Sequence, residues 1–535
     1  MASYYRDLRE YLETLKKNGR LVTIDRLINK DTEMHPLVRL QFRGLPEKDR
    51  KAFLFTNVTD STGKRYNVPV VVGCMASSRE IYAHGMNCSV EEIPAKWREA
   101  LIHPIPPVLV DKGPVQDVIL KGSELESAGG ISFIPVPIST PGFDNAPYLT
   151  AAHWITKDPT TGIRNVGNYR GMIKSPTRVG CFPGAMSQGV AIHWRQCKEM
   201  GKPLEAAIAL GVTPNISYCA VTRLPHPKDE FETAGGIAGS PVELVKCQTV
   251  DLEVPAHAEI VIEGTIPTDL GEIEGPFGEF TGFMGLRGVS LYFNVTCVTM
   301  RRDPIYQAFL SQFPPSESSK LRQMGREPVL KKTLSVDYNI PGVLDVHLME
   351  NTGCYGFVII KVSRRSPEEG ERLKQAVREI MKTWPAKTFV LVDEDIDPRD
   401  PDSVNWAISF RMQPHRDLEV FPTQSPTTLD CSISPTRETC TEAVLGKETV
   451  ASVLLLDART KWDYPPVSLP KKEFMERAIQ IWKEEGLPEL NQLKAPWFGY
   501  SMGCWTEEDA QEADLAVQSR YFETGKKLAT KREKL

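Results

Sequence analysis

The chain has 535 residues, of which 41% are hydrophobic and 25% charged, and its formal net charge is -5. This length allows about three or four domains, and the composition is that of a folded globular protein. Because the charges are spread through the chain without a basic face, nucleic acid and an anionic membrane surface are both disfavoured as partners.

The N-terminus and the cysteines indicate the compartment. Residues 1–7 lack the apolar core of a signal peptide, and no apolar run approaches the roughly 18 residues that span a bilayer. The eleven cysteines show no C-x-x-C pair and no Cys/His array at zinc spacing. We therefore expect reduced thiols, mostly in the core, and a cytoplasmic protein with no membrane partner.

Residues 1–118 form the first predicted unit, a mixed α/β segment. A helix is predicted over residues 4–18, with Ser3 as its N-cap and Gly19 as its stop. Its apolar stripe, at helical spacing, is Leu8, Tyr11, Leu12 and Leu15. Further predicted elements are strands over residues 20–24, 52–56 and 68–73 and a helix over residues 90–101.

Residues 119–312 form the second predicted unit, which is rich in β-structure. Short apolar or alternating runs are interrupted by Gly, Pro and Asn, and they cover residues 131–138, 206–210, 259–263 and 289–299. The last run alternates apolar and more polar residues, the period of a half-buried strand. Together with one helix over residues 186–200, which carries His193, these runs predict a barrel-like domain.

A third unit is predicted over residues 325–470. Apolar runs at 356–362 and 388–393 flank a charged helical stretch at 367–383, which indicates a β-α-β unit, and residues 451–457 add a buried strand. The acidic run at 393–397 is interpreted as helix caps and solvated charge rather than a metal cluster.

Residues 471–535 are predicted as a helical tail. Helices are expected over residues 471–486 and 505–531, ending in a solvated Lys-rich segment. The aromatic residues of 497–505 either dock the last helix or cover a site entrance, and docking is the favoured interpretation.

One stretch suggests chemistry: Glu274-Gly-Pro-Phe-Gly-Glu279 carries two carboxylates five residues apart. Gly275, Pro276 and Gly278 prevent the two from sharing a helix face, so they should project from a sharp loop. Taken alone, this pattern favours an exposed turn with solvated glutamates over an active-site loop.

Other polar residues upstream could complete a site. Arg170 has the side chain best shaped to hold a carboxylate by two parallel hydrogen bonds. Asn165, His193 and Glu230 would form an O/N ligand set suited to Mn²⁺ or Mg²⁺ bridging to a phosphate. Residues 235–240 are interpreted as a glycine-rich loop whose N–H groups approach phosphate.

Taken together and in this order, the motifs resemble the UbiD family of reversible decarboxylases, which use prenylated FMN. The similarity rests on residues 158–170, 229–230, 240–247, 251–256, 259–264, 274–279 and 456–462. It covers most of residues 1–470, and it changes the interpretation of residues 274–279 to a catalytic loop. The resemblance implies an α/β protein whose central split-barrel flavin-binding domain lies between an N-terminal α/β segment and a C-terminal α/β domain that dimerises.

The resemblance also implies roles for individual residues. Arg170, Glu274 and Glu279 match the catalytic set: Arg170 would orient the substrate carboxylate, Glu274 would hold Arg170, and Glu279 would return a proton to carbon. The cofactor-binding residues that match are Asn165, His193 and Glu230, as ligands of Mn²⁺ or Mg²⁺, and Lys461, as a contact to the cofactor phosphate. The family also uses K⁺.

The implied reaction is the non-oxidative decarboxylation of an aromatic, heteroaromatic or other α,β-unsaturated acid, either free or as a coenzyme A thioester. Breaking the bond leaves an electron pair that no side chain can accept, so the modified flavin is needed. The alternative is a catalytically silent flavin-binding subunit, against which the intact Arg170, Glu274 and Glu279 argue. Expected partners are the acid, CO₂, a flavin prenyltransferase as cofactor supplier, and further copies in a homodimer or homohexamer.

Overall fold

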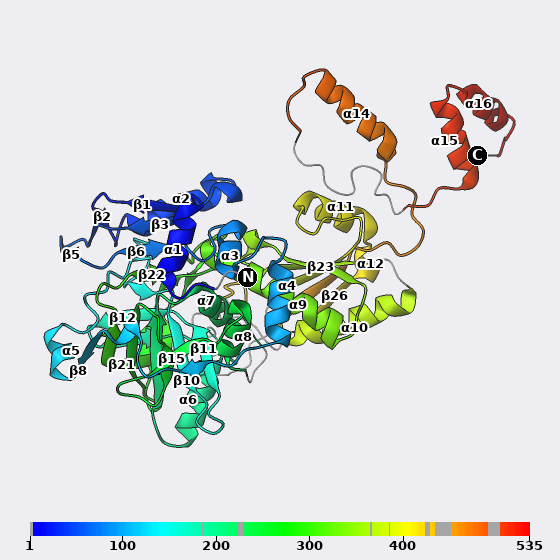
Figure 1. Ribbon diagram of the computed structural model, residues 1–535. Coiled ribbons are helices and arrows are strands. Elements are labelled where there is room, and N and C mark those ends of the chain that lie inside the picture. The colour runs from blue at the N-terminus through cyan, green and yellow to red at the C-terminus, as the bar shows by residue number, and fades with distance from the viewer. Residues whose placement is uncertain are drawn as a thin grey trace.

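The structure is a computed structural model that describes residues 4–184, 187–222, 224, 228–363, 366–384, 386–422, 429–433, 451–490 and 503–534. The chain forms an N-terminal α/β unit, a central unit around a large sheet, a C-terminal α/β unit and a helical tail that extends away from the rest (Figure 1). The predicted α/β fold with a barrel-like central sheet is confirmed.

The first helix, α1 (Leu8–Lys17), buries the predicted apolar stripe. It begins later than predicted because Asp7 caps it by accepting the N–H of Glu10, whereas Ser3 lies outside the described residues. Gly19 follows the helix with φ of 65°, as expected for a helix stop.

The N-terminal unit contains two small sheets and three further helices. The larger sheet has the order β1-β3-β6-β22, so a strand from residue 306 onward completes it. The elements are β1 (Leu21–Ile24), β2 (Ile28–Asn29), α2 (Met34–Gly44), β3 (Ala52–Phe55), β4 (Val58–Thr59), β5 (Arg65–Tyr66), β6 (Val70–Val72), α3 (Arg79–Met86), α4 (Ile93–Ile102) and β22 (Tyr306–Ala308).

The central sheet follows the order β11-β10-β14-β17-β21-β13-β12-β9, with β8 and β18 also paired to β21. The long strand β21 therefore joins both halves of the sheet. The strands are β8 (Val118–Lys121), β9 (Tyr148–Leu149), β10 (His153–Lys157), β11 (Arg164–Asn168), β12 (Gly171–Ser175), β13 (Arg178–Cys181), β14 (Leu204–Leu210), β17 (Ile260–Ile266), β18 (Glu272–Glu274) and β21 (Gly288–Met300).

Three of the four predicted strand runs of this unit are confirmed, and the run at residues 131–138 is not a strand. Pro135 and Pro137 remove two donors from any ladder there. The segment instead buries Ile131, Ile134 and Val136 as irregular chain against the sheet.

The sheet is contacted at β11 by three helices, α6 (Gly189–Glu199), α7 (Pro214–Val221) and α8 (Glu230–Ala238). The predicted phosphate loop at residues 235–240 is wrong, because Gly235 and Gly236 lie within α8. A Cβ on Gly236 would lie 2.9 Å from the Cα of Ala100 in α4. These glycines therefore allow two helices to pack closely, and they do not form an anion-binding loop.

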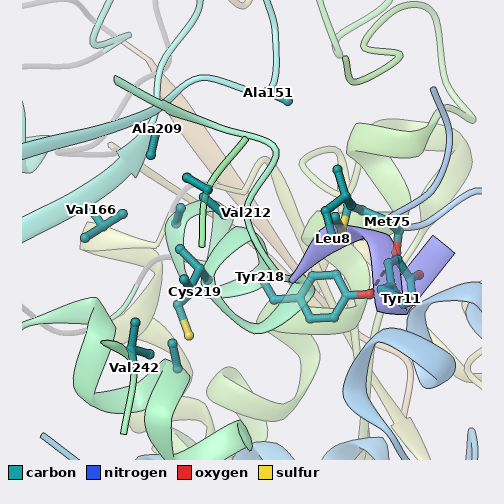
Figure 2. Packing of buried hydrophobic residues seen from close by; sticks show 14 of the residues in the cluster. Leu8, Tyr11, Met75, Ala151, Val166, Ala209, Val212, Tyr218, Cys219 and Val242 are labelled. Carbon is teal, nitrogen blue, oxygen red and sulfur yellow. Dashed lines mark hydrogen bonds between the residues drawn. The ribbon is translucent and has the colours of Figure 1, made fainter. Parts of the chain in front are cut away.

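The N-terminal and central units share one hydrophobic core. Figure 2 shows Leu8 and Tyr11 of α1 beside Met75 and Tyr218, with Val166 of β11 in the same cluster. The buried hydroxyl of Tyr218 donates to the carbonyl of Met75 at 3.0 Å. This shared core fixes β11, the strand that leads to Arg170, relative to the N-terminal helices.

The C-terminal unit begins with α9 (Glu317–Lys332), so residue 325, its predicted start, lies within a helix. The β-α-β prediction is confirmed: α10 (Pro367–Thr383) connects the parallel strands β24 (Phe357–Val362) and β25 (Thr388–Asp393). The remaining elements are β23 (Val343–Leu348), α11 (Pro401–Arg411), α12 (Pro414–Asp417), β26 (Leu418–Pro422) and β27 (Ser452–Asp457).

The acidic run at residues 393–397 differs from the prediction of caps and solvated charge. Asp393 and Asp395 are buried and both bind Arg411, whose Nη1 lies 2.8 Å from Asp395 Oδ1. Asp393 and Asp395 therefore form a buried ion pair with Arg411 that ties α11 to the end of β25, whereas Glu394 is exposed and Asp397 accepts the N–H of Arg399, as predicted for solvated charge and caps.

The tail consists of α14 (Lys472–Glu484), α15 (Glu507–Val517) and α16 (Tyr521–Ala529). The single helix predicted over residues 505–531 is thus two helices, separated at Ser519, whose φ is 62°. Most of the segment 497–505 lies outside the described residues. Across the described ranges, helices are too short or too polar to cross a bilayer, and the cysteines are free thiols.

Candidate active site

Arg170 lies between β11 and β12 and binds Glu274, the last residue of β18. Its Nε donates to Oε1 at 2.8 Å and its Nη2 donates to Oε2 at 2.6 Å. The exposed fractions are only 8% for Arg170 and 1% for Glu274. This paired geometry is the strongest that an arginine can make with a carboxylate, so the predicted pairing of these two residues is present.

The sharp loop predicted around Glu274 and Glu279 is also present. It continues through Gly275, whose φ is 89°, to the hairpin of β19 (Phe277–Gly278) and β20 (Met284–Gly285). A Cβ on Gly285 would lie 3.0 Å from Nη1 of Arg170, so only glycine lets the hairpin approach the guanidinium this closely.

Two residues hold the loop from a segment that the sequence did not single out. Asn145 donates to the carbonyl of Gly275 at 2.8 Å, and Asp144 accepts the N–H of Gly278 at 2.9 Å. Burial raises the pKa of Asp144 to about 6. No motif marks residues 144–145 as partners of a loop that lies 130 residues away, so only the fold reveals them.

Glu279 contacts the remaining nitrogen of Arg170, Nη1, and is itself 7% exposed. Burial raises the pKa of Glu279 against the opposing charges of Arg170 and Arg322. Burial would lower the pKa of Arg170, but the two carboxylates outweigh it and raise that pKa. The alternative of two solvated glutamates in an exposed turn is therefore wrong.

Aromatic rings fix the plane of Arg170. Its guanidinium carbon lies 4.0 Å from the ring centroid of Phe182 and 5.3 Å from that of Phe277. Phe182 is also the backbone bridge partner of Arg170. Stacking adds to the carboxylate contacts, so both together restrict the orientation of the guanidinium.

Asn165, His193 and Glu230 converge on one region of the central unit. Asn165 of β11 lies directly opposite Thr156 of β10, and the hydroxyl of Thr156 lies 2.8 Å from Nδ1 of His193. Glu230, at the start of α8, accepts the N–H of Val166 at 2.6 Å. The predicted set thus comes from one strand and two helices that meet at β11.

This set contains a buried carboxylate whose negative charge a bound cation would compensate. In the described structure no basic side chain pairs with Glu230, and burial raises its pKa to about 8. The neighbouring Asp229 is already engaged by Arg164, at 2.8 Å. Among the described residues, Nδ2 of Asn165 is buried without a hydrogen-bond partner, and as a donor it could serve a phosphate oxygen but not the cation itself. A divalent ion near Glu230 would compensate its charge, so the residues fit the predicted metal.

The set is not a carboxylate-rich metal centre. Within the described ranges, no group of three or more His, Cys, Asp or Glu side chains could hold a metal ion. Asn165, His193 and Glu230 contain only two such residues, so further ligands would have to come from the cofactor phosphate or water.

Lys461 lies in the C-terminal unit, on the wall of a cavity of about 420 Å³ that Lys374, Arg416 and Arg459 also line. Its ammonium donates to the carbonyls of Asp457 and Arg459, the latter at 2.7 Å. Burial lowers its pKa. The structure therefore places Lys461 among backbone carbonyls and the carboxylates of Asp417 and Asp457 in its own unit, and between the described residues it shows no contact to the Arg170 cluster.

Three family models of the 3-octaprenyl-4-hydroxybenzoate carboxy-lyase, UbiD, match the chain. Its N-terminal domain matches residues 12–101, its Rift-related domain residues 108–313 and its C-terminal domain residues 321–448. Curated relatives include an uncharacterised protein of Aquifex aeolicus, 30% identical over 91% of this chain and 100% of its own, and one of Synechocystis, 30% identical over 93% and 100%.

Solved structures show the same similarity. An evolved dimeric form of the UbiD-class enzyme HmfF from Pelotomaculum thermopropionicum, in complex with prFMN, is 30% identical, covers 87% of this chain and 97% of its own, and has a TM-score of 0.71. Vanillic acid decarboxylase from Sedimentibacter hydroxybenzoicus, in closed form, is 24% identical over 90% and 100%, with a TM-score of 0.77. The latter shows the shared fold alone.

Proposed function

The chain belongs to the UbiD family of carboxy-lyases, and on that premise we propose that it decarboxylates an aromatic, heteroaromatic or other α,β-unsaturated acid reversibly and without oxidation, using prenylated FMN. The observation that carries the proposal is the unequal contact of two buried carboxylates with Arg170. A similar structure holds prFMN, which supports this cofactor.

The unequal contact assigns different work to the two glutamates. Glu274 occupies the Nε and Nη2 edge of Arg170, so it fixes the guanidinium and leaves Nη1 to meet the substrate carboxylate. Glu279 stands at that same nitrogen. An arriving carboxylate would bring a second negative charge to Nη1, which favours the protonated form of Glu279.

Protonated Glu279 can then act as the acid of the reaction. When bound, the flavin supplies the electron sink that side chains lack. Glu279 delivers a proton to the carbon that has lost CO₂, and in the carboxylating direction it removes that proton. Arg170 keeps the carboxylate in place, and the rings of Phe182 and Phe277 support its guanidinium.

Asn165, His193 and Glu230 are assigned to Mn²⁺ or Mg²⁺ at the flavin phosphate, and this is a proposal that the uncompensated charge of Glu230 supports. Lys461 as a phosphate contact stays a prediction, because such a contact would have to replace a carbonyl that the ammonium now binds. The predicted K⁺ has no assigned ligand. The homodimer or homohexamer and the supplying prenyltransferase also stay predictions.

The alternative, a catalytically silent flavin-binding subunit, would not need a proton donor. Glu279 is buried beside Arg170 and carries a raised pKa, which favours an enzyme over a scaffold.

Arg170→Ala tests the function directly. The flavin-loaded protein should release CO₂ from at least one member of a panel of unsaturated acids. The variant should lose at least about 1000-fold in kcat/KM because the carboxylate is no longer positioned. Arg170→Lys should not restore turnover, since lysine cannot hold both oxygens of Glu274.

Arg178→Ala is the matched control, since Arg178 lies on β13 of the same sheet but pairs with the partly exposed Glu272. It should retain turnover. Substantial CO₂ release by Arg170→Ala would contradict the assigned role, and no release from any acid by the wild type would favour the silent subunit.

Glu230→Ala tests the metal assignment. Removing this carboxylate should lower bound metal and bound flavin together, because the ion offsets the phosphate charge. Elemental analysis and flavin absorbance of the purified protein measure both quantities. Glu232→Ala, two residues along the same helix, should change neither, and full flavin content in Glu230→Ala would exclude Glu230 as a ligand.

A further inference from the structure

A second arginine lies against the catalytic loop. The guanidinium carbon of Arg322, on α9, is 3.9 Å from the ring centroid of Phe280, the residue that follows Glu279. The charge of Arg322 acts on Glu279 and Glu279 acts on Arg322. The rings of Phe280 and of Tyr355 in the C-terminal unit meet in a T-shaped contact, with 6.4 Å between centroids. Arg322 therefore stands beside the proton donor, where α9 and the catalytic loop meet.

Arg322 has donors that the protein does not use. Its Nη1 donates to the carbonyl and the hydroxyl of Ser318, at 3.2 and 3.1 Å. In the described part of the chain, no hydrogen bond involves its Nε or Nη2 and no carboxylate lies within ion-pair distance. Arg170 uses this same edge to bind Glu274. The edge of Arg322 that fits a carboxylate is thus open.

Arg322 is half-buried beside the catalytic loop, and an anion could bind its unused donors. Burial lowers the pKa of Arg322, because part of its hydration is lost. Stacking on Phe280 holds the guanidinium plane but does not neutralise it. A planar carboxylate with two oxygens matches the Nε and Nη2 fork and would compensate the charge.

We propose that Arg322 binds a second carboxylate of the substrate, so that the preferred substrate is an unsaturated diacid. The carboxylate that leaves would lie on Arg170, beside Glu279, and the retained carboxylate would lie on the Nε and Nη2 edge of Arg322. This inference rests on the proposed decarboxylase function and specifies its substrate class. Arg322 is then a specificity-determining residue, and Ser318 positions it.

The test compares acids that differ only by the second carboxylate, such as cinnamate with 4-carboxycinnamate and benzoate with terephthalate. Calorimetry on the flavin-loaded protein measures binding, and CO₂ release measures turnover. The wild type should bind each diacid about 10- to 100-fold more tightly than its monoacid, as one charge-assisted bidentate contact provides.

Arg322→Gln should abolish this preference, and Arg322→Lys should restore part of it. Lys332→Gln is the matched control, because it removes one positive charge from the same helix, where Lys332 pairs with Asp337. It should retain the full preference.

The remaining outcomes distinguish the carboxylate subsite from the decarboxylase function. Turnover by the wild type without a diacid preference would overturn this inference and leave the proposed function intact. A diacid preference that depends on Arg322, without turnover of any acid, would support the carboxylate subsite and count against the function. If Arg322→Gln shifted only the pH profile of turnover, Arg322 would act through Glu279 and the subsite would be excluded.

Discussion

Glu274 and Glu279 contact the same guanidinium through different nitrogens, and this difference can be measured. If Glu279 delivers the proton, Glu279→Gln should keep the loop but lose at least about 100-fold in the rate at which the decarboxylated product exchanges its hydrogen in D₂O. That exchange reports the proton transfer alone, because no net CO₂ fixation is required. Mass spectrometry of the product follows it.

Glu274→Gln is the comparison within the same site. This variant should retain some exchange, because the loss of Glu274 weakens the positioning of Arg170 and leaves the proton donor, Glu279, in place. Exchange by Glu279→Gln at the wild-type rate would mean that another group or a water is the donor.

The pH dependence of decarboxylation follows from the direction of the pKa shift of Glu279. Burial raises the pKa of Glu279, so its protonated form persists to higher pH than that of an exposed glutamate. Decarboxylation needs this form, so turnover in that direction should fall as pH rises through the raised pKa. A rate that increased across this window would contradict the acid role.

At the residue scale, the sequence identified Arg170, Glu274 and Glu279 because each belongs to a local motif. Asp144 and Phe182 could not be identified in this way, since they reach the site through pairing and packing across the sheet. Arg322 was also missed. It lies on a helix with little apolar periodicity, interrupted in sequence by Pro328, so the helix itself was not predicted.

At the element scale, two explanations for Gly236 in α8 predict opposite changes in the free energy of unfolding. If Gly236 only occupied a free helix position, Gly236→Ala would stabilise the fold by about 1 kcal/mol through helix propensity. Because its Cβ would lie 2.9 Å from the Cα of Ala100, we expect a loss of about 1–3 kcal/mol instead. Chemical denaturation measures the free energy of unfolding.

Gly525→Ala in α16 makes the same change where nothing lies within 4 Å of the new Cβ, and it should not destabilise the protein. Because Glu230 begins α8, Gly236→Ala should also lower the metal content. Unchanged stability together with lost flavin would instead restore the phosphate-loop interpretation.

Regular elements were predicted well where one local signal dominates. Residues 367–383 have a charged helical pattern between two apolar strands, and α10 has these same limits. The strand prediction for residues 131–138 was wrong. The apolar residues there indicate burial, but Pro135 and Pro137 cannot donate hydrogen bonds to a β-ladder. The prediction of a phosphate-binding loop at the glycines of α8 was wrong, because composition cannot distinguish a glycine-rich loop from glycines that allow close helix packing.

At the scale of the whole molecule, the tail differs from the other units. Helices α14, α15 and α16 bury no residue of their own, and they stand apart from the rest of the chain (Figure 1). Apolar side chains such as Phe474 and Phe522 are exposed. A hydrogen bond of 2.7 Å from the N–H of Cys504 to the carbonyl of Tyr464 returns the chain to the C-terminal unit.

This arrangement predicts the result of removing the tail. Since its described helices bury almost nothing, a chain ending at residue 470 should keep its thermal midpoint within about 2 °C of the full chain, because little apolar area is lost. The predicted dimer contact lies in residues 325–470, so light scattering should give the truncated protein the same number of copies as the full chain.

A control that ends at residue 502 removes only α15 and α16. If the dimer were lost in the shorter chain and kept in this control, α14 would carry the contact between copies. If the midpoint fell by 10 °C or more, the tail would be part of the folded core, and its exposed helices would have to pack on another copy.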